Sequence, residues 1–216
     1  MKRALVILIV AVLVLTSVSA KSRNDSVRFG FEGGFGKNET NAVTAEEEAR
    51  DIKIKDNGFY ADALLEYHFN DDIALKISGG VQYQRKAEVK IGDSDSYKLD
   101  EKTGLTIEAS VLLRYAFYRY DGFGLYASIG AEGIMSKIGP ESETYSKDNL
   151  TNIGFGVAAE LGTEIEVAYN TFFTLGVKGA YIFYDSTKLL KGDDASLKTM
   201  SMYLVRPYVG FAYRIY

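Results

Sequence analysis

Apolar and polar side chains alternate with a period of two along most of this chain. The stretch 203–216 shows the pattern clearly, because one phase is apolar and the other holds mostly small or charged residues. Successive side chains of a β-strand point to opposite faces, so the pattern predicts a strand with one apolar face. The apolar phase of this stretch contains Val205, Val209, Phe211, Tyr213 and Ile215.

Eight segments carry the alternation, and we expect each of them to be a strand. The links between them alternate in length, from short turns to long polar loops. Short turns at one end and long loops at the other predict an all-β fold, an eight-stranded antiparallel up-and-down transmembrane β-barrel. The segments are 27–35, 59–69, 73–83, 105–117, 123–132, 153–167, 173–183 and 203–216. The short turns are 70–72, 119–122 and 169–171, and the long links are 37–57, 86–104, 136–150 and 185–198.

The aromatic residues of the apolar phase indicate which way the apolar faces point. They gather beside the short turns and beside the long links, with Leu, Ile, Val and Ala between them. Two girdles of rings around an aliphatic band match the two interfaces of a bilayer, so we expect the apolar faces to contact lipid. The alternative is a periplasmic sandwich or a lipocalin-like barrel, in which the same faces would form the core. The rings are Tyr67, Phe69, Tyr115, Phe117, Phe123, Tyr169, Phe173 and Tyr213 at one end, and Phe35, Phe59, Tyr83, Phe155, Tyr181, Phe183 and Tyr203 at the other.

The N-terminus has the features of a signal for export. Lys2 and Arg3 precede the apolar run 4–14, and Val18-Ser19-Ala20 is a small-residue cleavage site. We therefore expect a cleaved signal peptide at 1–20 and an outer-membrane β-barrel domain at 21–216, located in the bacterial outer membrane. An uncleaved membrane anchor is the alternative, but the run is short for a span of about 20 apolar residues.

Composition excludes several kinds of chemistry. The chain of 216 residues has no Cys, one His and a formal net charge of −4. Without Cys there is neither a disulfide framework nor a thiolate site. The negative net charge does not favour binding to nucleic acid. Asp93-Ser94-Asp95 lacks the remaining spacing of a calcium loop, so we expect no metal and no cofactor.

The chain resembles the small eight-stranded outer-membrane barrels of the OmpA/OmpX type, from about Val27 to Tyr216, without a peptidoglycan-binding domain. The terminal stretch 209–215 is similar to the strand that this family presents to the barrel-assembly machinery, although Ile215 holds the terminal apolar phase and Tyr216 follows it. The resemblance implies a bare barrel, a partnership with that machinery and with outer-membrane lipid. We also expect a monomer, and a bulge at Pro207 because proline cannot donate to a ladder.

The polar phase predicts an ionic network inside the barrel. Eight strands leave an interior that side chains fill, and buried charges must pair. A turn centred on Asp71 places Glu66 opposite Lys76, and a turn centred on Asn170 places Lys178 diagonal to Glu160 and Glu164. We expect these charges to plug the lumen, with a solvated lumen as the alternative. The candidate network is Glu66, Lys76, Arg114, Glu160, Glu164 and Lys178.

Specificity is expected to lie in the long links. The alternation in 81–91 continues past the predicted membrane edge and resumes at Tyr97 and Leu99, which predicts a protruding hairpin. Its edge could pair with another chain, or it could be a simple strand overhang.

Three functions stay open: a structural or adhesion-like surface protein with a partner at the loops, a narrow porin-like channel for small solutes, and a lipid A-modifying enzyme. We expect no enzyme, because His68 lies near a periplasmic turn and no Gly-x-Ser-x-Gly elbow is present.

Overall fold

A computed structural model describes residues 26–44, 51–92, 97–99, 104–138, 150–184 and 197–215. The predicted signal peptide at 1–20 lies outside these ranges. All regular structure within them is β-strand. No α-helix in this part of the chain is long and apolar enough to span a membrane. The strands are β1 (Ser26–Thr44), β2 (Asp51–His68), β3 (Ile73–Ile91), β4 (Tyr97–Leu99), β5 (Gly104–Tyr120), β6 (Phe123–Ile138), β7 (Leu150–Ala168), β8 (Thr171–Tyr184) and β9 (Leu197–Ile215).

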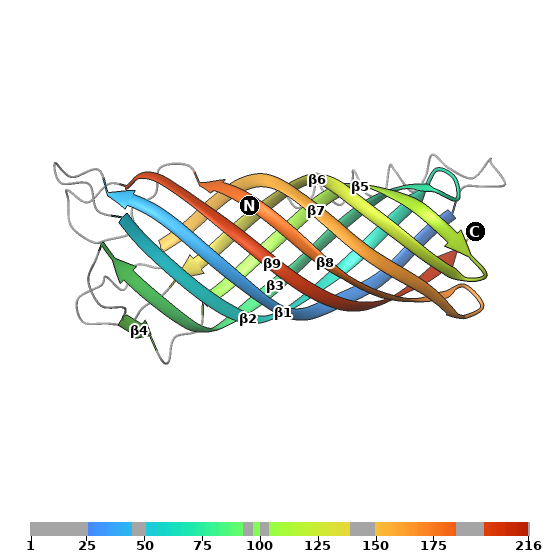
Figure 1. The fold of residues 1–216 in the computed structure, drawn as a ribbon, viewed down its shortest axis with the longest axis horizontal. Coiled ribbons are helices and arrows are strands. Elements are labelled where there is room, and N and C mark those ends of the chain that lie inside the picture. The colour runs from blue at the N-terminus through green and yellow to red at the C-terminus, as the bar shows by residue number, and fades with distance from the viewer. Residues whose placement is uncertain are drawn as a thin grey trace.

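The strands form one closed antiparallel barrel (Figure 1). Apart from β4, strands that follow one another in sequence pair with each other, and β9 returns to pair with β1, which closes the cylinder. The short β4 lies on β3 outside the ring of eight. The predicted eight-stranded up-and-down barrel is therefore confirmed.

The apolar faces point outward, as the girdles predicted. Phe211, Val111 and Leu175 are each about half exposed, at 58%, 47% and 49%. Lys76 and Glu108, on the opposite phase, are 1% and 4% exposed. A lipid-facing apolar band around a polar interior is the pattern of a transmembrane barrel, and it excludes a sandwich or lipocalin-like core.

The strands are steeply tilted. Following the register once around the barrel from Glu32 leads back to β1 at Ala42, ten residues further along (42 − 32). Because of this shift, side chains that lie at the same level along the barrel axis are not register partners on neighbouring strands. Partners across the lumen therefore cannot be read from neighbouring-strand pairing alone.

Two predictions about register need correction. Lys178 lies directly opposite Glu160, because the two-residue turn after Ala168 and a bulge between Glu166 and Ala168 shift the hairpin from the predicted register. Pro207 makes no bulge, since the register of β9 is unchanged on both sides of it. Instead, the β1–β9 ladder lacks pairs at Phe35 and Gly36, which accommodates a residue without an N–H.

Several strands run beyond the predicted membrane edge. β1 and β2 pair as far as Val43 and Asp51, and β3 continues to Ile91, so the links predicted at 37–57 and 86–104 are partly strand. The protruding hairpin predicted for 81–91 is confirmed, with β4 paired to β3. We call residues 37–44, 51–57 and 86–91 the extension.

The extension rises above the apolar band on the side of the long links. β1 has 19 residues, which at roughly 3.3 Å per residue gives a strand about 60 Å long. A spanning strand needs only ~9–11 residues. The outward side chains change from Phe35 and Phe59 to Lys37 and Lys55 at this level. The extension therefore projects from the outer membrane surface.

Candidate functional site

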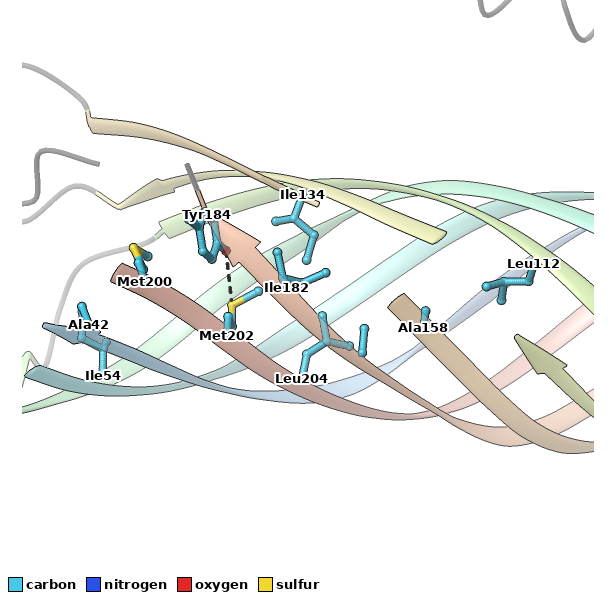
Figure 2. Close-up of a cluster of buried hydrophobic side chains, with 11 residues drawn as sticks. Ala42, Ile54, Leu112, Ile134, Ala158, Ile182, Tyr184, Met200, Met202 and Leu204 are labelled. Atoms are coloured by element: carbon cyan, nitrogen blue, oxygen red, sulfur yellow. Dashed lines mark hydrogen bonds between the residues drawn. The ribbon is translucent and has the colours of Figure 1, made fainter. Parts of the chain in front are cut away.

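Side chains fill the lumen in two layers. Near the short turns lies an ionic layer, in which charged groups from five strands meet. Nearer the extension lies an apolar layer (Figure 2). The ionic layer contains Arg28, Glu32, Glu66, Lys76, Arg114, Glu160 and Glu164. The apolar layer contains Ala42, Ile54, Ile134, Ile182, Tyr184, Met200, Met202 and Leu204.

Lys76 is the hub of the ionic layer. Its ammonium donates to both carboxylate oxygens of Glu32 at 2.8 Å and to those of Glu160 at 2.9 and 3.1 Å. These partners come from β1 and β7, so the three groups tie distant strands together across the lumen. One ammonium between two buried carboxylates leaves no spare cation, so its loss would set like charges against each other.

Two arginines hold two carboxylates beneath this hub. Arg114 Nη1 donates to Glu66 Oε1 at 2.6 Å, and its Nη2 donates to Glu164 Oε2. Arg28 Nη1 donates to the same oxygen of Glu164 at 2.6 Å. Alternating charges of this kind attract one another, which offsets part of the cost of burying them.

Tyrosines connect the hub to the barrel wall. Tyr126 and Tyr208 hydroxyls are hydrogen-bonded at 2.6 Å, and Tyr208 also donates to Glu160. Arg114 stacks over the Tyr126 ring, 3.5 Å from its centroid. Gly162 makes room for the pair, because a Cβ there would lie 2.6 Å from the Tyr126 hydroxyl. The aromatic rings thus fill space that aliphatic side chains could not fill without losing these hydrogen bonds.

Between the two layers, charges pair less completely. Lys178 Nζ lies 3.2 Å from Glu132 Oε2, and Arg206 contacts Glu108 and donates to Gln82 at 2.6 Å. Within the described residues, Asp62 Oδ1 and Glu108 Oε1 are buried without a hydrogen-bond partner. Among the described residues, the buried side chains comprise eight carboxylates and five Lys or Arg. They are Glu32, Asp56, Asp62, Glu66, Glu108, Glu132, Glu160 and Glu164 against Arg28, Lys76, Arg114, Lys178 and Arg206.

All six residues predicted for the network lie in the lumen, but their partners differ from those expected. Glu66 does face Lys76 in register, yet their side chains bind other groups. Lys178 binds Glu132 in place of Glu160 or Glu164. The polar phase of the sequence also contains Arg28, Glu32, Glu132 and Arg206, for which hairpin register alone assigns no partner. Sequence reasoning missed Tyr208 altogether, since an aromatic residue in a lumen phase gives no signal of its own.

The apolar layer packs without charge. Ile182 and Leu204 are almost fully buried, and the Tyr184 hydroxyl lies 3.5 Å from the Met202 sulfur. Figure 2 shows these side chains gathered near the ends of β1, β2, β8 and β9. The sequence carried a signal for this layer, because Met200, Met202 and Leu204 are apolar on the phase that is polar elsewhere.

Asp56 lies in the extension, beside the apolar layer. Burial raises the pKa of its carboxyl to about 7, although the amide of Asn38, which donates to it at 2.7 Å, opposes the rise. Asn38 also donates to Gln82 at 3.1 Å. Among the residues that the structure describes, no group of His, Asp and Glu is arranged to hold a metal ion.

Fold and interior together define the class: a transmembrane barrel of the outer membrane whose lumen is filled by side chains. The family of the outer membrane protein beta-barrel domain matches residues 8–205, so the chain belongs to that family. It is therefore a protein of the bacterial outer membrane.

Solved structures share this fold. OprG from Pseudomonas aeruginosa is 16% identical, with a TM-score of 0.59 over 89% of this chain and 98% of that one. AlkL, solved in lipid bilayers, is 12% identical, with a TM-score of 0.52 over 91% and 93%. Neisserial surface protein A is 10% identical, with a TM-score of 0.51 over 86% and 96%. No curated protein sequence matches the chain.

Proposed function

We propose that this protein is a closed barrel that acts at the cell surface, as a structural or adhesion-like protein, through its extension and long links. The observation that carries the proposal is the contrast between a filled lumen and strands that continue well above the apolar band. A filled lumen offers no wide path for solutes. Paired strands above the membrane offer a rigid surface to a partner.

The outward face of the extension supports this role. Lys37, Lys53 and Lys55 are exposed there, and Lys53 lies 3.1 Å from Glu39. Charges of both signs on a rigid sheet suit a polar extracellular partner more than they suit lipid. We infer that the partner binds at the extension. We also infer that the barrel is monomeric, that a cleaved signal peptide directs its export, and that the barrel-assembly machinery recognises β9.

A trimmed variant tests the surface role. Thr40 and Ile54 are register partners, so replacing residues 41–53 by Asn-Gly should close the hairpin with a two-residue turn. Cells carrying the trimmed chain should adhere less to protein-coated or polysaccharide-coated surfaces than cells carrying the full chain. The control shortens the link 185–196 by the same approach, and heat-modifiable gel migration verifies folding of both. Equal adherence of the trimmed and full chains would exclude the trimmed part of the extension as the binding surface.

A narrow channel is the second candidate, favoured by the excess of buried carboxyl groups over buried Lys and Arg. If ions cross, the excess of buried carboxylates should select cations. Planar-bilayer recordings of the refolded chain distinguish the two functions. We expect little current from the native chain and more from Lys76→Ala, in which the hub is lost. Steady cation-selective current through the native chain would favour the channel.

We further propose that the protein has no enzymatic activity. His68 is buried, and its Nε2 lies 3.2 Å from Glu66 Oε2, within the ionic layer and at the end opposite the extension. A hydrogen-bonded lumen histidine suits a structural role. Mass spectrometry of lipid A from cells with and without the protein tests this, and any protein-dependent change in lipid A would contradict it.

A further inference from the structure

A cavity of about 250 Å³ lies at the short-turn end of the barrel, opposite the extension. Its wall combines lumen-facing Phe172 and Glu164 with the β5–β6 turn and the end of β9. The frame is rigid, because Glu166 N donates to Gly122 O at 2.7 Å and Arg214 N donates to Asn170 O at 2.8 Å. Backbone bonds between neighbouring hairpins therefore hold the cavity open in a fixed shape.

Two guanidinium groups line this cavity. Arg119 Nη2 lies 3.6 Å from Glu164 Oε1, beyond hydrogen-bond distance, while Arg28 and Arg114 already bind the other oxygen of Glu164. Within the described part of the chain, Arg119 Nε is buried without a hydrogen-bond partner. Arg214 stacks over the Phe172 ring, 4.7 Å from its centroid. Arginine forks suit a phosphate or carboxylate, so this part of the wall favours an anion.

The rim of the cavity carries the opposite charge. Glu166 and Asp121 line it and are exposed to solvent. The backbone of Asn170 donates to Glu166 Oε1 at 3.1 Å, which holds that carboxylate in place. A ligand that fits both parts has an anionic group toward the arginines and a cationic group toward the rim.

The cavity also reaches the lipid-facing surface. Tyr120 and Phe123 line it, and they are 72% and 37% exposed at the level of the aromatic girdle. Such rings settle at the level of lipid headgroups. The cavity is smaller than the roughly 300–1,000 Å³ of pockets for drug-sized ligands. Its volume therefore suits a headgroup whose acyl chains stay in the bilayer.

We propose that this cavity binds the phosphoethanolamine headgroup of a phospholipid in the periplasmic leaflet. The phosphate accepts hydrogen bonds from Arg119 and Arg214, and the primary ammonium donates to Glu166 and Asp121. Phosphatidylglycerol lacks the ammonium, and phosphatidylcholine carries a quaternary ammonium that cannot donate hydrogen bonds. The site should therefore select phosphatidylethanolamine over both lipids.

Native mass spectrometry of the refolded full chain, with each of the three lipids added in turn, tests the proposal. We expect phosphatidylethanolamine to bind at least fivefold more tightly than the other two. Arg119→Gln should weaken this binding at least fivefold, and Glu166→Gln should abolish the preference over phosphatidylglycerol. Lys53→Gln, at the opposite end of the barrel, is the matched control and should change neither. Equal binding of the three lipids to the native chain would overturn the proposal, as would unchanged binding to folded Arg119→Gln.

A second measurement separates the lipid from a soluble ligand with the same chemistry. Soluble phosphoethanolamine should shift the amide resonances of Gly122 and Phe172 and displace the lipid at millimolar concentration. Inorganic phosphate should do so more weakly. If soluble phosphoethanolamine binds while the lipid in bilayer nanodiscs leaves these resonances unchanged, the assignment to a lipid is wrong.

Discussion

The two layers fill the same lumen with different interactions, ion pairs in one and apolar packing in the other. In the ionic layer, Lys76 and Arg114 each satisfy specific carboxylates from other strands at hydrogen-bond distances. In the apolar layer, Leu204 and Ile182 are buried without any such partner. Apolar packing tolerates changes of shape, whereas a buried charge depends on one particular partner. The ionic layer therefore fixes which strands meet, and the apolar layer adds stability with little specificity.

The largest effect should follow from removing the hub of the ionic layer. Lys76→Ala leaves Glu32 and Glu160 buried without their shared cation. Breaking a buried ion pair from one side typically costs about 3–5 kcal/mol. Urea titration followed by heat-modifiable migration on a gel measures the loss. Lys53→Ala is the control, since its exposed pair with Glu39 should contribute at most about 1 kcal/mol. Equal stability of both variants would show that the ionic layer is not a network.

A somewhat smaller effect is expected in the apolar layer. Leu204→Ala removes a fully buried side chain and leaves a cavity, at a cost of about 2–4 kcal/mol. Because no charge is exposed, bilayer current should stay at the native level, unlike that of Lys76→Ala. Unfolding and current measured on the same preparation test both statements. A rise in current equal to that of Lys76→Ala would show that the apolar layer forms the seal.

Gly162→Ala tests the tyrosine bridge between the ionic layer and the wall. The added Cβ would lie 2.6 Å from the Tyr126 hydroxyl, so the Tyr126–Tyr208 pair must move. Overpacking of this kind costs about 1–3 kcal/mol. The matched control is Gly179→Ala, whose Cβ would meet only the Leu204 carbonyl oxygen at 3.8 Å. Equal unfolding midpoints for the two variants would contradict the tight fit around the bridge.

The last effect concerns pH and Asp56. Its pKa is raised from 3.8 to about 7 in the folded chain, so folding favours the protonated carboxyl. Its contribution is therefore present below about pH 4 and is lost as the pH rises through about 7. Asp56→Asn should remove this dependence and be more stable than the native chain at pH 8. Unfolding curves at pH 4 and pH 8 measure the difference. A native-minus-variant difference that does not change with pH would contradict the raised pKa.

The sequence predicted the features that depend on residues close together along the chain or on the two strands of one hairpin. Alternation and girdles located the barrel, and the turn at Asp71 gave the register of Glu66 and Lys76 correctly. Cross-lumen partners such as Glu32 and Glu160 were beyond reach, because the strand tilt brings together residues that no local register relates. Lys178 was misplaced for a local reason, the bulge after Glu166, which leaves no signature in residue type.

The gap in the β1–β9 ladder at Phe35 and Gly36 has a consequence for the order of assembly. Every other seam of the barrel joins strands that follow one another along the chain, and such hairpins can form early. This seam joins Val27 to Ile215, so its closure bears the greatest loss of chain entropy and should be the slow, final step. By weakening that junction, Pro207 gives the unfinished barrel a last strand that is held loosely until both of its neighbours are in place.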